Sequence, residues 1–262
     1  MKKTLSIISL LLISNAHASG GFTWLSQAAH AFGVHDAHHI EHILTFALVG
    51  ILLLVAGLVY RTKVADINKA VVPDKGITFR NMIELYGSFI YGQAKAVLGE
   101  KDANKYFGFV ATVFLLIFIS NAIGLIPGIL PPTENINTTM ALGVLSFVYF
   151  NMKGCKELGT FNYLKHFAGP LWYMAVLIFP IEILSTCIRP VSLALRLYGN
   201  MFGDHMVLGT FSKLAPVGVP VIFMMLGFLV CFIQAYVFTM LSMVYISLAT
   251  AHHDHGEHEH HH

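Results

Sequence analysis

Long apolar stretches alternate with short charged segments along this chain. Residues 43–60 form a run of 18 positions without a charged side chain, and the run ends at Arg61 and Lys63. A helix needs about 20 predominantly apolar residues to cross a bilayer. The pattern predicts membrane-spanning helices at the following stretches: 43–60, 106–130, 136–152, 167–211 and 221–248.

The stretch 167–211 is long enough for two spans or for one long tilted helix. Pro170, Pro180 and Pro190 are positions at which it could kink. Counted as one span, it gives five. Residues 78–98 mix apolar side chains with scattered charges, which is typical of an amphipathic helix at a membrane surface. The predicted fold is therefore all-α: a polytopic membrane protein with about five transmembrane helices, a surface helix, and a long tilted helix pair.

Both ends of the chain differ from this membrane domain, which we place at residues 43–250. Residues 1–18 resemble a cleaved signal peptide, with two lysines, a short apolar run and Ala16-His17-Ala18. Residues 19–42 are rich in His and contain no Lys or Arg, and residues 251–262 form a tail rich in His and acids. Either segment could bind a metal, but a solvated approach to the membrane and a mobile tail are the favoured interpretations.

The basic residues predict the orientation. The loops 61–105 and 153–165 carry most of the Lys and Arg, whereas 19–42 and 131–139 carry none. The positive-inside rule places the first two loops in the cytoplasm and the other two segments outside. An outside N-terminus agrees with the signal peptide, and five spans then put the C-terminus in the cytoplasm.

Composition supports this class of protein. The chain is 56% hydrophobic and 11% charged, whereas soluble domains are about a quarter charged. The net charge of +2 is too small to suggest nucleic-acid binding. The three cysteines are widely separated and form no CxxC motif, and no GxxxxGK[ST] nucleotide loop is present.

Three charged residues follow one another at intervals of seven within 167–211: Glu182, Arg189 and Arg196. A charge in the middle of a bilayer costs at least about 2.5–3.5 kcal/mol, so such residues pair, face water or carry function. A spacing of seven returns to nearly the same helix face. Small residues repeat at the same interval one row over: Ser185, Ser192 and Gly199. Such a stripe permits the close approach of another helix.

Arg196 is the strongest functional candidate, because Glu182 lies about 21 Å further back on the helix and cannot pair with it. Arg189 precedes Pro190 and is interpreted as structural. Asn200 shares the Arg196 face, whereas His205 lies on roughly the opposite face. Gln234, in the last span, is either a polar contact between helices or a neighbour of Arg196.

These residues stand in motifs that resemble subunit a of F-type ATP synthases. The resemblance rests on 190–201 (PVSLALRLYGNM), 233–239 (IQAYVFT), 244–247 (VYIS), 139–144 (TMALGV) and Ser120-Asn121, and it covers about residues 40–250. It implies a proton-translocating, non-catalytic stator subunit without a cofactor in a bacterial inner membrane. It also implies three kinds of partner: the ring of c subunits, a peripheral stalk of b subunits and membrane lipid.

The resemblance implies a role for each matched residue. Arg196 resembles the essential arginine that faces the ring, with Asn200 and Gln234 as polar neighbours. Glu182 corresponds to the acid of a cytoplasmic half-channel. A periplasmic half-channel is implied for Asn121, Thr139 and His205. The chain departs from the family at Gly124 and Gly227, where an acid is common, and Asp204 is a candidate substitute for a lost acid.

Two other functions remain open at this point. A secondary transporter or metal carrier would use the His-rich ends together with Glu182, Arg189 and Arg196, and it should show an internal repeat, which this sequence lacks. An intramembrane enzyme would need a nucleophile and a base within a span. His166 and His205 have no such partner in the sequence.

Overall fold

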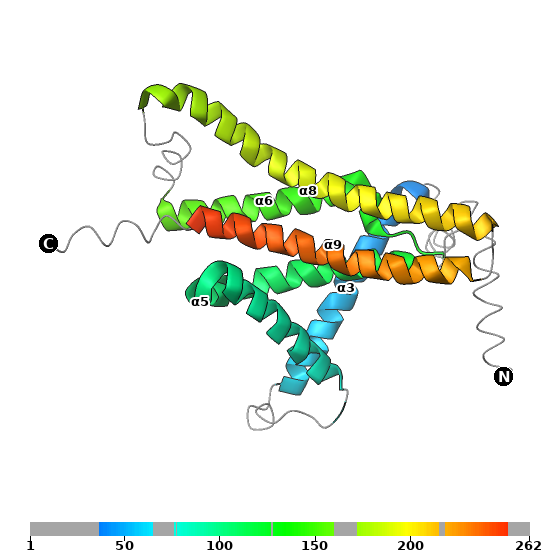
Figure 1. The fold of residues 1–262 in the computed structure, drawn as a ribbon. Helices are drawn as coiled ribbons and strands as arrows, with labels where there is room; N and C mark the ends of the chain where they lie inside the picture. The colour runs from blue at the N-terminus through cyan, green and yellow to red at the C-terminus, as the bar shows by residue number, and fades with distance from the viewer. Residues whose placement is uncertain are drawn as a thin grey trace.

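The computed structural model describes residues 37–64, 76, 78–126, 128–159, 172–214 and 218–250. Within these ranges all regular structure is helical (Figure 1). The elements are α3 (Ala37–Val64), α5 (Phe79–Ala122), η1 (Ile123–Leu125), η2 (Pro132–Glu134), α6 (Ile136–Leu158), α8 (Trp172–Leu214) and α9 (Val219–Thr250). The prediction of an all-α protein is confirmed. The predicted signal peptide, most of the His-rich N-terminal segment and the tail lie outside the described residues.

Four helices are both long enough and apolar enough to cross a membrane. Their spans are Glu41–Val64, Phe79–Leu125, Ile178–Phe211 and Val219–Ala249. The fifth predicted span forms α6, whose 23 residues are sufficient in length but include more polar side chains. Large apolar side chains are exposed on the outer surface, as in Leu54 of α3 and Ile222 of α9. Such a surface suits lipid rather than water.

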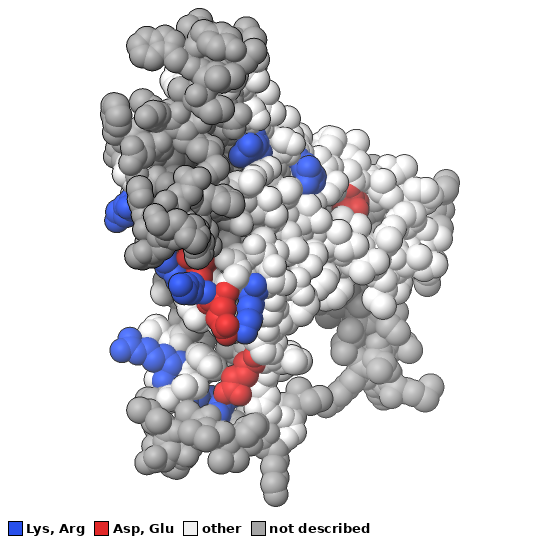
Figure 2. All heavy atoms as spheres, turned by 60° about the vertical axis from the view of Figure 1, so that its left-hand side comes forward, with Lys and Arg blue, Asp and Glu red and all other residues white. Residues whose placement is uncertain are grey.

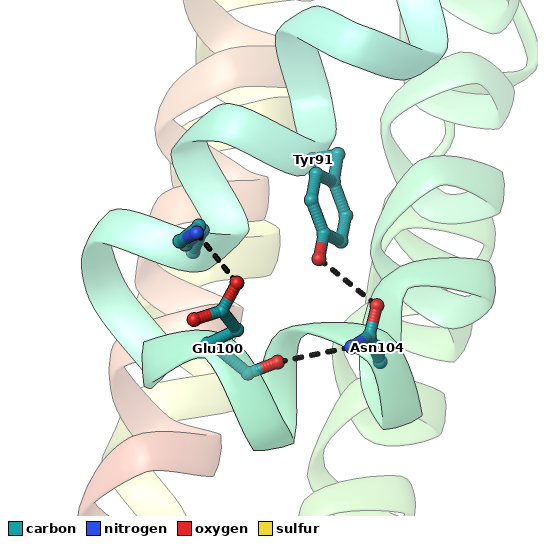
Figure 3. Close-up of polar contacts among 4 residues, drawn as sticks. Tyr91, Glu100 and Asn104 are labelled. Atoms are coloured by element: carbon teal, nitrogen blue, oxygen red, sulfur yellow. Dashed lines mark hydrogen bonds and ion pairs between the residues drawn. The ribbon is translucent and has the colours of Figure 1, made fainter.

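Helix α5 contains a sharp break that separates the predicted surface helix from the following span. Gly99 has φ +81° and ψ 171°, a conformation that favours glycine because it has no Cβ. Across the break, Lys95 Nζ lies 2.7 Å from Glu100 Oε1, and the Tyr91 hydroxyl donates to Asn104 Oδ1 at 3.0 Å (Figure 3). These contacts join the two segments at the bend.

The span expected at 106–130 is shorter than predicted, because the helix ends at Ala122 and continues only as the 3-10 turn η1. Pro131 adopts an extended conformation, with φ −66° and ψ 134°. Proline at this position cannot donate a backbone hydrogen bond, and the chain leaves the helix before it.

The stretch predicted as one or two spans forms one helix. Helix α8 has 43 residues and retains Pro180 and Pro190 inside it. At 1.5 Å per residue its length is about 64 Å, twice the hydrocarbon thickness of a bilayer. Figure 1 shows α8 and α9 side by side over the second half of α8, whereas the first half of α8 diverges from the other helices. The long helix pair is therefore confirmed.

The core lies between the second segment of α5, α6, α8 and α9. Tyr106, Ile117, Leu197 and Phe238 are completely or almost completely buried there. Polar side chains also link the helices, since the hydroxyls of Ser146 and Ser242 lie 3.0 Å apart in the core. The surface helix is held in the same way, because Tyr236 of α9 donates to Gln93 Oε1 at 3.0 Å.

Charged side chains are unevenly distributed over the surface. Figure 2 shows Lys, Arg, Asp and Glu gathered on one part of the face, whereas most of the rest carries none of them. One such group joins α5 to α6, where Lys105 and the Tyr106 hydroxyl both contact the Glu157 carboxylate. Lys153 lies over the Tyr106 ring, 5.8 Å from its centroid. A membrane helix that concentrates its charges near one end leaves an apolar surface for lipid.

Helices α6 and α8 approach each other closely at Gly143. A Cβ at this position would lie 2.7 Å from the carbonyl oxygen of Pro190 and 3.4 Å from Cβ of Ala194. The first contact is too short for real atoms, and its partner is backbone, which cannot rotate away. Glycine is therefore required for this packing.

We predict that Gly143→Ala destabilises the protein by about 1–3 kcal/mol, because the two helices must separate to accept the methyl group. Gly108→Ala is the matched control, since no atom lies within 4 Å of the Cβ position of this exposed helical glycine. Thermal unfolding of the detergent-solubilised protein measures both. Equal midpoints for the two variants would contradict the predicted close contact.

Candidate functional site

Arg196 projects from the exposed face of α8, and the small-residue stripe lies on the same helix. Its side chain has no ion pair or hydrogen bond within the part of the chain that the structure describes. Ser185, Ser192 and Gly199 are exposed as well, and a Cβ on Gly199 would have no atom within 4 Å. The stripe predicted from the heptad spacing therefore lies on the surface of the subunit. There is open space beside the guanidinium for a second helix.

One turn after Arg196, Asn200 connects α8 to α9. Its Nδ2 donates to Oε1 of Gln234 at 2.7 Å. Gln234 is only 3% exposed, and its own Nε2 has no hydrogen-bond partner among the described residues. The sequence predicted both amides as neighbours of Arg196; the structure shows them hydrogen-bonded to each other, and within the described residues neither forms a hydrogen bond to the guanidinium. This hydrogen bond fixes α8 relative to α9 one helical turn after Arg196.

On the other side of α8, a small cavity of about 20 Å³ lies between α5, α8 and α9. Three candidates from the sequence line it, namely Asn121, Asp204 and His205. Asn121 Nδ2 and Asp204 Oδ2 are buried and make no hydrogen bond within the described residues. Buried polar groups of this kind, in a cavity with enough room, are typical sites for ordered water.

Two polar side chains of the turn η2 contact residues that line this cavity. Thr133 donates from Oγ1 to Asn121 Oδ1 at 2.8 Å. The next residue, Glu134, places Oε2 2.7 Å from Nδ1 of His205. No functional role was predicted for Glu134, because the only signal was an acid in a loop without basic residues. Its partner lies 71 positions away, and no periodic pattern connects the two.

The remaining candidates lie elsewhere. The Thr139 hydroxyl donates to the carbonyl oxygen of Ile136 in its own helix at 3.0 Å, and this residue does not line the cavity. Glu182 belongs to α8, but its side chain is outside the described part. Arg189 lies 5.1 Å from the ring centroid of Tyr245, a cation–π contact that suits the predicted structural role.

Metal binding gains no support from the described residues. Among them, no group of three or more His, Cys, Asp or Glu side chains could hold an ion. The His-rich tail and most of the N-terminal histidines lie outside these ranges.

Comparison with known proteins identifies the family. Residues 43–247 match the family described as ATP synthase A chain. The ATP synthase subunit a of Bdellovibrio bacteriovorus is 44% identical over 82% of this chain and 93% of its own length. The chain belongs to the ATP synthase subunit a family. The subunit a of Sorangium cellulosum is 41% identical over 84% of this chain and 86% of its own length. That of Geobacter sulfurreducens is 47% identical over 66% of this chain and 76% of its own length.

The two glycines at which the chain departs from the expected subunit a pattern both line the cavity. A Cβ on Gly124 would lie 2.6 Å from the Pro131 ring, so an acid cannot fit there without moving the loop. A Cβ on Gly227 would lie 3.0 Å from Leu125 and 3.7 Å from Oδ2 of Asp204. Asp204 therefore lies beside the position that lacks an acid.

The Asn200–Gln234 contact predicts an asymmetric pair of substitutions. We expect Asn200→Ala to destabilise the subunit by about 1–3 kcal/mol, because the buried Gln234 amide loses its donor. Gln234→Leu should cost less, since Asn200 is exposed and can find other partners. In the double variant Asn200→Ala/Gln234→Leu, the destabilisation caused by Asn200→Ala should largely disappear, because no buried amide is left without a donor. Thermal midpoints of the three variants decide this, and simple additivity would contradict the contact.

Proposed function

We propose that this chain is the stator subunit of a rotary ATP synthase. It provides two proton half-channels where it meets the ring of c subunits, and it couples proton flow to rotation of the ring. The observation that carries the proposal is the exposed guanidinium of Arg196 on a face of small residues, with no acid of the described chain beside it. Burial of such a charge in a membrane requires a partner. Similar proteins are named ATP synthase subunit a, which supports a partner within that complex.

The electrostatics of Arg196 suits a carboxylate that moves past it. A ring carboxylate exposed to lipid must be protonated, because the ionised form is too costly there. Opposite Arg196 the ionised form is favoured, so the carboxyl group releases its proton into one half-channel. As the ring turns onward, the group takes a proton from the other half-channel and returns to the lipid in its neutral form.

Arginine suits this task because its guanidinium keeps its proton at all relevant pH values. It acts as a fixed charge and carries no protons. A fixed positive charge between the half-channels also repels protons, and this prevents a direct leak between them.

We place the periplasmic half-channel at the cavity beside Asn121, Asp204 and His205, with Thr139 near its outer end. The buried polar atoms at this cavity and the residues that line it support this placement. Glu182 would line the cytoplasmic half-channel on the other side of Arg196. Asn200 and Gln234 would hold α8 and α9 in register beside the arginine.

The work comes from the membrane potential. Each proton that crosses 100 mV supplies about 2.3 kcal/mol. The ring passes this work to the nucleotide-binding sector, and the present subunit neither makes a bond nor binds a nucleotide. We place it in a bacterial inner membrane with the N-terminus outside and the C-terminus in the cytoplasm, anchored against the peripheral stalk of b subunits.

The variant Arg196→Ala tests the proposal. We expect the complex to assemble but to lose ATP-driven proton pumping, because no charge remains to deprotonate the ring carboxylate. Arg61→Ala, at the end of α3 and far along the chain from this face, is the control and should pump normally. Acidification of inverted membrane vesicles measures both variants. Normal coupled pumping by Arg196→Ala would refute the proposed role.

A further inference from the structure

The ion pair between Glu134 and His205 joins a short turn to the second half of a long membrane helix. Glu134 is the last residue of the short turn η2, and His205 lies in the second half of α8. Their closest atoms, Oε2 and Nδ1, are 2.7 Å apart. A proton can transfer directly between two groups at this distance.

The accessibility of the two side chains suits a proton entry point. The Glu134 side chain is 20% exposed and that of His205 is 31% exposed, so both reach the surface of the subunit. His205 also lines the cavity that holds the buried Oδ2 of Asp204. The pair therefore connects the surface on one side with a buried polar space on the other.

The turn that carries Glu134 is fixed in place. Thr133 donates to Asn121, and the backbone N–H of Glu134 donates to the carbonyl oxygen of Pro131 at 3.1 Å. Thr133 is completely buried. A carboxylate on such an anchored turn keeps a constant distance to its partner, which proton transfer requires.

From these contacts we infer that Glu134 is the acid that exchanges protons with His205 at the mouth of the cavity. This inference rests on the proposed proton path and adds a residue to it. A proton that binds Glu134 moves from Oε2 to Nδ1 of His205, which leaves a carboxylate and an imidazolium. The imidazolium then releases the proton of Nε2 into the cavity, which leaves a neutral ring with its proton on Nδ1. Proton exchange with water moves that proton from Nδ1 to Nε2 and frees Nδ1 for the next transfer.

Isosteric substitution separates proton exchange from packing. Glu134→Gln keeps the shape of the side chain and a polar group beside His205, but it has no titratable group. Glu134→Asp keeps the acid. Glu84→Gln is the matched control, because Glu84 also forms a 2.7 Å ion pair, with Arg80 on the surface helix away from the cavity.

The measurement is passive proton flux through the membrane sector. Vesicles that carry the whole complex are stripped of the nucleotide-hydrolysing sector, and a potassium diffusion potential drives protons through the remaining part. We expect Glu134→Gln to lower the flux about tenfold or more, a magnitude typical of a lost proton-transfer group. Glu134→Asp should retain most of the flux, and Glu84→Gln should retain all of it.

His205→Ala completes the experiment. If the two residues act as one unit, this variant lowers the flux to a similar level, and the double variant Glu134→Gln/His205→Ala is no worse than either alone. Unchanged flux in Glu134→Gln would overturn the inference, as would loss of flux in Glu134→Ala with full flux in Glu134→Gln. Either result would leave the proposed function intact as long as Arg196→Ala still abolishes pumping.

Discussion

A permanent positive charge on the membrane-exposed face of a helix is the constraint around which this subunit is organised. Arg196 cannot lose its proton, and a charge within a bilayer costs several kcal/mol unless a partner or water compensates it. In the described chain no acid does so. We propose that a partner outside the subunit compensates it, since the small residues on the same exposed face leave open space, as at Gly199.

The rest of the fold keeps the two sides of α8 separate. The Asn200–Gln234 contact fixes α8 against α9 one turn from the charge, and the close approach at Gly143 fixes α8 against α6. On the opposite side of α8 lies the cavity with its buried Asp204 oxygen, and His205, which lines it, is paired with Glu134 of the turn η2. A single long helix thus presents a fixed charge on one side and titratable groups on the other. In the proposed mechanism this arrangement separates the site of ring deprotonation from the path that supplies protons.

Sequence patterns predicted the features that depend on local periodicity. The apolar runs gave all five long helices, and the spacing of seven placed Ser192 and Gly199 on an exposed face. The Asn200–Gln234 neighbourhood came from the family motif. The break at Gly99 was visible only as a change from amphipathic to apolar sequence. Glycine adopts both positive and negative φ, so its presence alone does not predict a break in a helix. The Glu134–His205 pair escaped prediction, since it joins a three-residue turn to a distant helix and depends on how the loop folds back over the bundle.

Disulfide cross-linking in native membranes would test most directly whether the Arg196 face meets the ring. In a background without native cysteines, one cysteine replaces Ser192 on the exposed face of α8, and another replaces Ala194 on its buried face. A cysteine beside the carboxylate of the ring helix is the common partner. The account predicts rapid cross-linking of the ring to position 192 and none to position 194. No cross-link at 192, or equal yields at both positions, would contradict it.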